Sequence, residues 1–341
     1  MEAQQDRTIT LEDLAREAGV SVSTVSRALS GNPAINAATR ARIVELAGHH
    51  GYDAPVRRPR KRVQGGALSI AVVLAPQAPS MPRPFDPFSL SLIGGIGAAM
   101  RERGLPLTIS PITPGDQAGL TQLLEDEPHD GVILLGQSML HTALNRSAGT
   151  LGRFVVWGAE ADDQRYCSVG SDNLRGGQRA AAHLARLGRR RIAFLGATAT
   201  YELQQRRSGY EKALRDADLP FDPTLVRECA LDPDGAIEAV DDLLDSGVEI
   251  DAIVAGSDLA AIGAMRALAR RGISVPDDVA VVGYDDIELA GHTHPALTTI
   301  RQDTMKAGRL LVGKLMRLID GFPAQSERLE TELIVRESCG A

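Results

Sequence analysis

Hydroxyl side chains are concentrated in one short stretch of the chain, Gly19 to Gly31, which reads GVSVSTVSRALSG. Its pattern predicts a helix, although Ser and Thr are weak helix formers because their side chains compete for backbone hydrogen bonds. On a helical projection, one face holds the apolar residues Val25, Ala28 and Leu29, and Ser23 and Arg27 lie almost opposite. Hydroxyls bind phosphates and Arg bridges two acceptors of guanine, so the outward face suits the major groove of DNA.

The surrounding residues predict three short helices. Thr10, followed by Asp13 three residues later, is typical of a helix start, and Gly19 ends that helix. Ser21 is suited to cap the second helix and Asn36 the third. Two short helices around a Gly-containing turn, followed by a third helix, predict a helix-turn-helix domain.

The charge of the 341-residue chain is distributed unevenly. The first 66 residues carry 10 basic and 7 acidic side chains, whereas the other 275 carry 27 and 37, for a net charge of -7. A basic end on an acidic body predicts a polyanion-binding module, although a solvated charged tail has the same signature. Residues 55–66, PVRRPRKRVQGG, predict a linker, since they are rich in Pro, Gly and basic side chains and lack apolar periodicity.

From Ala67 onward, short apolar runs alternate with helical patterns. Continuously apolar strands that alternate with helices predict parallel sheets covered on both faces, and a body of this size suits two such sheets. The expected strands are residues 68–75, 107–110, 130–136, 153–158, 191–196, 252–256 and 279–284.

The composition argues against several classes of protein. No run approaches the ~20 apolar residues that span a bilayer. The start shows no secretion signal, so we expect a cytoplasmic protein without a membrane partner. The three cysteines lie far apart without a CxxC pair, which argues against a disulfide framework or a zinc site. No GxSxG, HExxH or GxxxxGK[ST] motif occurs, so we expect no enzymatic activity, no metal and no cofactor.

The helical start extends into a longer pattern. TITLEDLAREAGVSVSTVSRALSGNPAINAATRARIVELAGHHGY resembles the DNA-binding domain of LacI/GalR-type bacterial transcription regulators. RRSGYEKAL, DAIVAGSDLAAIGAMRALARRGISVPDDVAVVGYDDIELA and HPALTTIRQDTMKAGRLLVGKLMRLIDG resemble the effector-binding core of that family. The resemblance implies a small all-α helix-turn-helix domain, followed by an α/β effector domain of two doubly wound parallel-sheet subdomains like those of periplasmic binding proteins.

This resemblance also implies a domain plan. We expect a DNA-binding domain at 1–54, a linker at 55–66 and an effector domain at 67–341. Subdomain one would comprise residues 67–166 and 293–324, and subdomain two residues 167–292 and 325–339.

The same resemblance implies a homodimer on an inverted-repeat operator of double-stranded DNA. At matching positions, Val22, Ser23 and Arg27 would face base edges. Phosphates would be contacted by Thr10, Ser21, Thr24, Ser26, Asn36, Thr39 and Tyr52. In many family members the linker forms a hinge helix with an apolar wedge, but Pro59 and Lys61 depart from that pattern. We therefore expect this linker to bind phosphates through Arg57, Arg58, Arg60, Lys61 and Arg62.

The expected effector site lies beyond the carboxyl ends of the strands, where open α/β sheets bind ligands. The polar candidates that follow predicted strands are Gln137, Asp172, Asn173, Ser257, Asp258 and Asp285. Of the neighbours Asp285 and Asp286 we expect only the first to face ligand, and Asp258 is equally suited to cap the next helix. The family resemblance adds Arg206 as a ligand-gripping arginine. The aromatic candidates are Trp157, which also suits the core, and Phe88, with Phe85 and Tyr201 nearby.

Carboxylates, amides and an Arg fork complement vicinal hydroxyls, so a small sugar is the expected effector. The predicted function is a repressor of carbohydrate-utilisation genes that leaves a palindromic operator when the sugar binds. One alternative is a corepressor-type regulator that binds a purine or a phosphorylated sugar. Another is a sugar-binding transport protein without a regulatory role, although the helix-turn-helix argues against it.

Overall fold

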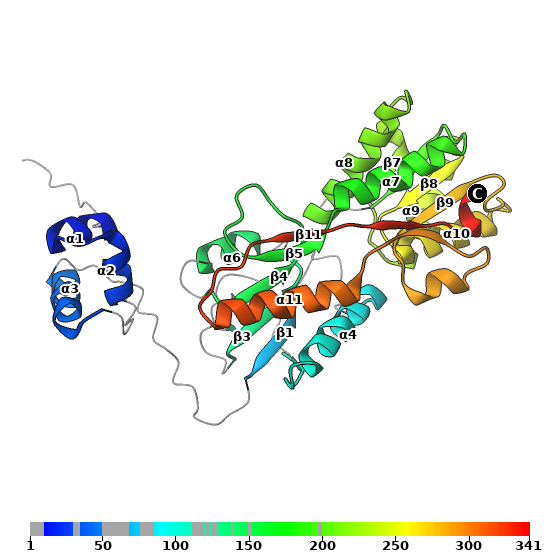
Figure 1. Ribbon diagram of the computed structural model, residues 1–341. Coiled ribbons are helices and arrows are strands. Elements are labelled where there is room, and N and C mark those ends of the chain that lie inside the picture. Colours follow the sequence, from blue (N-terminus) through cyan, green and yellow to red (C-terminus); the bar gives the residue numbers. More distant parts are fainter. Residues whose placement is uncertain are drawn as a thin grey trace, which may run out of the picture. The chain divides into compact units, whose positions relative to one another are not determined.

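The structure is a computed structural model, which describes residues 10–29, 35–49, 68–75, 85–110, 119–120, 123–124, 129–137, 140–148, 152–196 and 200–341. The chain divides into two compact units, residues 1–66 and residues 67–341 (Figure 1). The predicted linker at 55–66 lies outside the described residues.

The described residues of the first unit form three helices, α1 (Leu11–Ala18), α2 (Val22–Leu29) and α3 (Ala37–His49). Thr10 and Asp13 form a reciprocal capping box at the start of α1, and Gly19 ends the helix in the left-handed conformation with φ 63°. The predicted caps of the other two helices are confirmed, since the Ser21 hydroxyl accepts from Thr24 N–H and the Asn36 side chain accepts from Thr39 N–H. The buried core between the helices includes Leu14, Val25, Ala28, Ile43 and Ala47.

The second unit contains two six-stranded sheets with one strand order. The first sheet runs β2 (Thr108–Ile109), β1 (Ile70–Leu74), β3 (Gly131–Leu135), β4 (Phe154–Trp157), β5 (Ser168–Ser171), β11 (Glu327–Leu329). The second sheet runs β7 (Val226–Arg227), β6 (Ile192–Leu195), β8 (Ala252–Ala255), β9 (Ala280–Asp285), β10 (Thr298–Arg301), β12 (Glu332–Ile334). Neighbouring strands are parallel in both sheets, except that β12 is antiparallel to β10.

Helices cover the strands of each sheet and define two lobes. The first lobe has α4 (Pro87–Arg101), α6 (His141–Ser147) and α11 (Thr304–Ile319). The second lobe has α7 (Asn173–Arg186), α8 (Tyr201–Asp216), α9 (Pro233–Asp245) and α10 (Asp258–Arg270). Short 3-10 helices occupy Pro223–Leu225, Glu288–His292 and Glu337–Cys339. None of the helices in the described ranges is long and apolar enough to cross a membrane.

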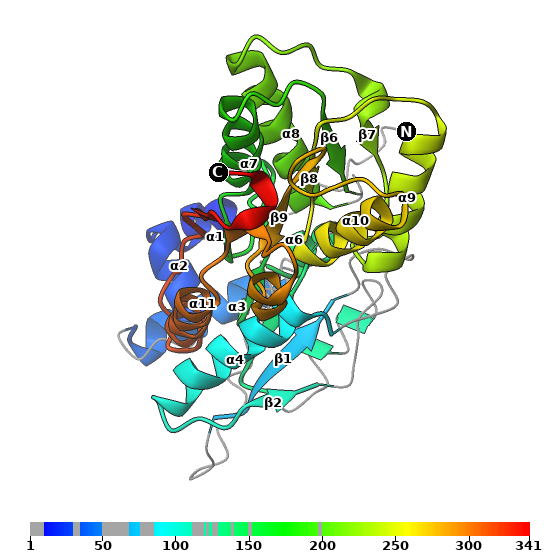
Figure 2. The same cartoon turned by 90° about the vertical axis from the view of Figure 1, so that its right-hand side faces the viewer.

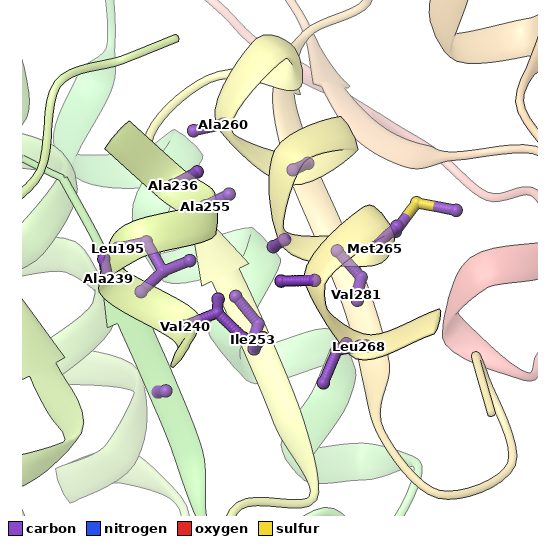
Figure 3. Packing of buried hydrophobic residues seen from close by; sticks show 14 of the residues in the cluster. Leu195, Ala236, Ala239, Val240, Ile253, Ala255, Ala260, Met265, Leu268 and Val281 are labelled. Carbon is purple, nitrogen blue, oxygen red and sulfur yellow. The ribbon is translucent and has the colours of Figure 1, made fainter. Parts of the chain in front are cut away.

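The strands are apolar on both faces, which is the reason for the two-sided helical cover. In the second lobe, Leu195, Ile253 and Val281 pack against side chains of α9 and α10, such as Val240 and Leu268 (Figure 3). Together these residues make one of the two buried cores of that lobe.

Two helix pairs pack with their backbones close together, and α4 lies beside α11 in both views of the chain (Figures 1 and 2). A Cβ atom on Gly95 of α4 would overlap the carbonyl oxygen of Thr304 at the start of α11. In the second lobe, a Cβ atom on Gly209 of α8 would overlap the carbonyl oxygen of Leu174 in α7. Both helix pairs therefore require glycine at the crossing point.

All seven predicted strands are present. The predicted subdomain boundaries, however, assign three further strands to the wrong subdomain. The predicted boundaries assign β5 and β11 to subdomain two, but both lie in the first sheet; they assign β10 to subdomain one, but it lies in the second sheet. The chain crosses between lobes after β5, after β10 and after β11, so each crossing comes a few residues later than expected. These strands are short and rich in Ser, Thr, Gly and charged residues, so they contain no apolar run that would predict a strand.

Candidate effector pocket and DNA-binding face

The predicted DNA-binding face is exposed on α2. Val22, Ser23 and Arg27 are exposed, whereas Val25 on the opposite side is fully buried. The Ser21 hydroxyl lies 2.8 Å from the hydroxyls of both Ser23 and Thr24, so three hydroxyls form one cluster at the start of the helix. These oxygens and the positive end of the helix dipole together suit a phosphate.

Other predicted DNA contacts have structural roles or fall outside the described residues. Thr10 and Asn36 cap α1 and α3, and Thr39 is half-buried in the first turn of α3. The side chain of Ser26 lies outside the described residues, as do Tyr52, Arg57, Arg58, Arg60, Lys61 and Arg62.

A pocket lies between the two lobes at the carboxyl ends of their strands, where the fold places ligands. Five of the nine predicted effector residues line it: Phe88, Trp157, Arg206, Ser257 and Asp285. The other lining residues are Phe85, Asp86, Pro87, Gly136, Thr200, Glu202, Leu203, Leu231, Asp232, Leu259 and Ile287.

Arg206, on the second turn of α8, is held in place by its surroundings. Its Nε donates to Asn173 Oδ1 at 2.8 Å, and its Nη1 donates to the carbonyl oxygen of Gly256. The guanidinium carbon lies 3.6 Å from the centre of the Tyr284 ring, a cation–π contact. Nη2 makes no hydrogen bond to the part of the chain that the structure describes. This nitrogen is therefore available to a ligand acceptor, and the rest of the side chain is already ordered.

Asp285 ends β9 beside Arg206. Its Oδ1 accepts from Gln302 Nε2 at 2.7 Å and lies 3.9 Å from Arg206 Nη1. Burial raises the pKa of Asp285 well above its ordinary value, and the nearby Arg206 charge opposes that rise. Asp285 and Asp286 both have positive φ, 118° and 56°. Asp286 points instead to Arg301 and Arg336, at 2.7 and 2.6 Å, so only the first of the two lines the pocket.

Two further carboxylates reach the pocket from helix starts. Asp86 Oδ1 accepts from Ser89 N–H and caps α4, and Asp232 Oδ1 accepts from Gly235 N–H and caps α9. The sequence motif Asp-Pro, which occurs at both places, is typical of a helix start and identifies both residues. It does not show that the two helix starts meet at one pocket.

The first lobe supplies an aromatic wall. The ring centres of Phe88 and Trp157 lie 5.9 Å apart, with the planes tilted by 43°. Trp157 is 8% exposed and packs in the core of the first lobe while also lining the pocket, so it combines both predicted roles. Phe88 packs against apolar residues of both lobes.

Four predicted effector residues do not line the pocket. Gln137 is fully buried, donates to the carbonyl oxygen of Ala159 and accepts from Tyr166 Oη. Asp172 caps α7 by accepting from Arg175 N–H. Asn173 donates to the carbonyl oxygen of its neighbour Ser171, and its Oδ1 orders Arg206.

Asp258 is the fourth residue outside the pocket lining. It is fully buried, with Oδ2 accepting from Ile287 N–H at 2.9 Å and Oδ1 accepting from the Thr299 hydroxyl. Burial raises its pKa to about 7. The neighbouring Ser257, not Asp258, caps α10. A polar residue after a strand lies beside helix starts and loop backbone, and here those groups take the side chain instead of a ligand.

Comparison with known proteins accounts for this combination of units. Residues 10–54 match the model of bacterial regulatory proteins of the lacI family, and residues 181–339 match a periplasmic binding protein-like domain. The chain is 33% identical over 344 residues to the HTH-type transcriptional regulator CelR of Thermobifida fusca, covering 98% of the chain and 99% of CelR. The chain belongs to the lacI family of bacterial regulatory proteins. The predicted family and fold class are thereby confirmed.

Further comparisons also cover nearly the full length of the chain. The HTH-type transcriptional regulator MalR of Streptomyces coelicolor is 31% identical, with 97% of the chain and 96% of MalR covered. The solved CelR–cellobiose complex superposes with a TM-score of 0.70 at 32% identity, covering 97% of the chain and 99% of that structure. The operator-bound lac repressor dimer, at 24% identity and a TM-score of 0.70, shares the fold; 98% of the chain and all of that structure are covered. This lacI-family chain is a DNA-binding transcriptional regulator, and its family consists of regulators, not enzymes.

Proposed function

We propose that this lacI-family regulator is a cytoplasmic, homodimeric repressor of carbohydrate-utilisation genes, and that a small sugar in the pocket releases it from a palindromic operator. The observation that supports this most directly is the composition of the pocket, which sets aromatic rings against hydrogen-bonding side chains. A pyranose ring has an apolar face that packs on aromatic rings and a rim of hydroxyls that bind carboxylates and Arg.

The charge of the pocket supports an uncharged sugar over a phosphorylated one. Among the lining residues that the structure describes, Arg206 is the only basic one, whereas Asp86, Glu202, Asp232 and Asp285 are acidic. A phosphate dianion would meet carboxylates on several sides, and like charges in a partly buried site repel strongly. Because CelR has been solved with cellobiose, this disaccharide is our first candidate effector.

The proposed effector is tested with the tryptophan that the pocket already contains. Trp157 is the only tryptophan of the chain, so its fluorescence reports on the pocket without a label. We expect a saturable change with cellobiose or a related neutral sugar, and none with the corresponding 6-phosphate. A response to phosphorylated sugars or purines alone would favour the alternative of a corepressor-type regulator.

We further propose that residues 1–54 bind the operator, that the linker at 55–66 follows its phosphates and that residues 67–341 bind effector and partner subunit. Val22, Ser23 and Arg27 would contact bases. Ser21, Thr24 and Thr39 would contact phosphates, together with Thr10, Ser26, Asn36, Tyr52 and the basic linker side chains. Arg27 and Thr39 give the cleanest test, because neither side chain caps a helix.

The DNA contacts are tested by two variants. Arg27→Ala should lose about 1–3 kcal/mol of discrimination at one base pair, whereas Thr39→Ala should weaken binding to all sequences alike. Gel-shift titrations with the operator and single-base variants measure both. If both variants lost only general affinity, the assignment of Arg27 to bases would be wrong.

Gel shifts with the effector decide between repressor modes. Release by 100-fold requires the sugar to favour the released state by about 2.7 kcal/mol per dimer. A sugar that strengthened DNA binding would indicate a corepressor, and a chain without salt-dependent DNA affinity would fit the transport-protein alternative. A DNA-binding dimer should lose roughly 0.9 log units of affinity per log unit of salt for each phosphate contact.

A further inference from the structure

Glu202, in the first turn of α8, makes a contact from one lobe to the other. Its helix belongs to the second lobe, where Tyr210 Oη donates to the carbonyl oxygen of Ile192 in β6. The Glu202 carboxylate extends to the loop after β4 of the first lobe and accepts from Ala159 N–H through Oε1, at 3.1 Å. One side chain of the second lobe therefore holds the backbone of the first.

Two neighbours of Glu202 on α8 contact the first lobe as well. Gln205 Nε2 donates to the carbonyl oxygen of Glu160 at 3.2 Å. The ring centre of Tyr201 lies 5.3 Å from that of His141, in an edge-on arrangement. Three side chains in the first two turns of α8, those of Tyr201, Glu202 and Gln205, thus contact the first lobe.

The second carboxylate oxygen of Glu202 differs from the first. Oε2 is shielded from solvent and has no hydrogen-bond partner within the described residues. Glu202 also lines the effector pocket, beside Arg206 and Thr200. A carboxylate oxygen can only accept hydrogen bonds, and leaving one buried without a donor is unfavourable.

We propose that Glu202 couples effector recognition to closure of the lobes, with Oε1 holding Ala159 N–H and Oε2 accepting from a hydroxyl of the effector. The inference rests on the proposed function, because it requires that the pocket bind the effector. One carboxylate then completes its hydrogen bonds only when both the first lobe and the effector are in place. The effector thereby stabilises the arrangement in which the lobes are joined at the start of α8.

The proposal assigns Glu202 a role in specificity. Arg206 Nη2 requires an acceptor on the effector, whereas Glu202 Oε2 requires a donor. A sugar hydroxyl meets the second requirement, and an ether or a deoxygenated carbon at the same position does not. A site built to bind a hydroxyl rejects an analogue that lacks it, because the buried oxygen is left unpaired.

Two substitutions distinguish the roles of the two carboxylate oxygens of Glu202. Glu202→Gln keeps an oxygen for Ala159 N–H and replaces the second carboxylate oxygen with an amide nitrogen, which can only donate. Glu202→Ala removes both acceptors. Gln205→Ala is the matched control, since it removes a contact between lobes from the same helix but does not line the pocket.

The experiment combines Trp157 fluorescence, with cellobiose as the probe, and amide hydrogen exchange at Ala159. We expect Glu202→Gln to weaken the affinity for the probe at least about tenfold, with slow exchange at Ala159 in the free protein. Glu202→Ala should weaken affinity by at least as much and also speed exchange at Ala159. Gln205→Ala should change affinity less than about threefold.

The outcomes separate this inference from the proposed function. Equal probe affinity in the wild type and Glu202→Gln would overturn the role of Oε2. Unchanged exchange at Ala159 in Glu202→Ala would overturn the role of Oε1, and this measurement needs no effector. If cellobiose failed to change the fluorescence of the wild type, the choice of sugar would fail, and the exchange measurement would still decide whether Glu202 holds the first lobe.

Discussion

The two lobes of the effector unit have one strand order but present different chemistry to the pocket. The first lobe contributes the aromatic rings of Phe88 and Trp157. The second contributes most of the charged side chains, including Glu202, Arg206 and Asp285. The strands behind both walls are equally apolar and buried. The fold therefore depends on strand interiors, and ligand chemistry is set by a few residues at strand ends and in the first two turns of the helices beside the pocket.

The strongest test of this comparison is Arg206→Ala in the charged wall. Removing the guanidinium deprives Asp285 of its counter-charge and the effector of a fixed donor, which should cost about 2–5 kcal/mol of binding free energy. Fluorescence titration measures the loss. The control is Arg207→Ala on the same helix. Its ion pair with Glu211 lies near the surface and should contribute at most about 1 kcal/mol to stability, so the variant should bind the effector almost as the wild type does. Equal losses in both variants would contradict the assignment.

The helix pairs behind the walls give the next test. Gly95→Val should destabilise the first lobe by about 3 kcal/mol, since the new side chain must displace the backbone of Thr304. Gly94→Ala has open space around it and should stabilise the same helix by about 0.5–1 kcal/mol. Urea denaturation compares the two. A tolerated Gly95→Val would show that α4 and α11 can move apart.

A buried carboxyl in the second lobe should make stability depend on pH. The pKa of Asp258 is raised to about 7 in the native protein, so the native state retains a proton that the unfolded chain releases near pH 4. Stability therefore falls as the pH rises from about 4 to about 7. Between pH 5.5 and 7.5 the wild type should lose about 2 kcal/mol more than Asp258→Asn, at roughly 1.4 kcal/mol per pH unit. Parallel pH profiles from urea denaturation would contradict this.

The smallest effect is expected at the aromatic wall. Phe88→Ala removes a ring that contacts Trp157 and both lobes, and should weaken effector binding by about 1–2 kcal/mol, or roughly tenfold. Phe221→Ala, at an exposed site away from the pocket lining, is the control. If Phe88→Ala reduced affinity more than Arg206→Ala, the charged wall would not dominate recognition.

The sequence was sufficient for the helix caps of the first unit and for the strands with continuous apolar runs. Thr10, Ser21 and Asn36 cap their helices through partners three residues away, so a local pattern contains the whole interaction. The strands β5, β10 and β11 are not predicted from apolar runs, because their composition is polar.

The direction of polar side chains after the strands was harder to predict. Asp258 is bound by Ile287 and Thr299, which lie 29 and 41 residues away, and no local pattern identifies such partners. Asn173 likewise accepts a hydrogen bond from Arg206 and does not line the pocket. Asp86 and Glu202 reach the pocket only because the two lobes meet there, and that depends on the chain crossings.

The crossing after β11 has a consequence for synthesis. β11 and β12 each form one of the two outer strands of a sheet, and they are separated by two residues near the end of this chain (Figure 1). As the ribosome releases the chain from its N-terminus, neither sheet can gain its last strand until residues 327–334 emerge. The three helices of the first unit have no such requirement and can fold while the rest is still being translated. The nascent regulator can therefore acquire its three-helix unit before the unit that contains the pocket.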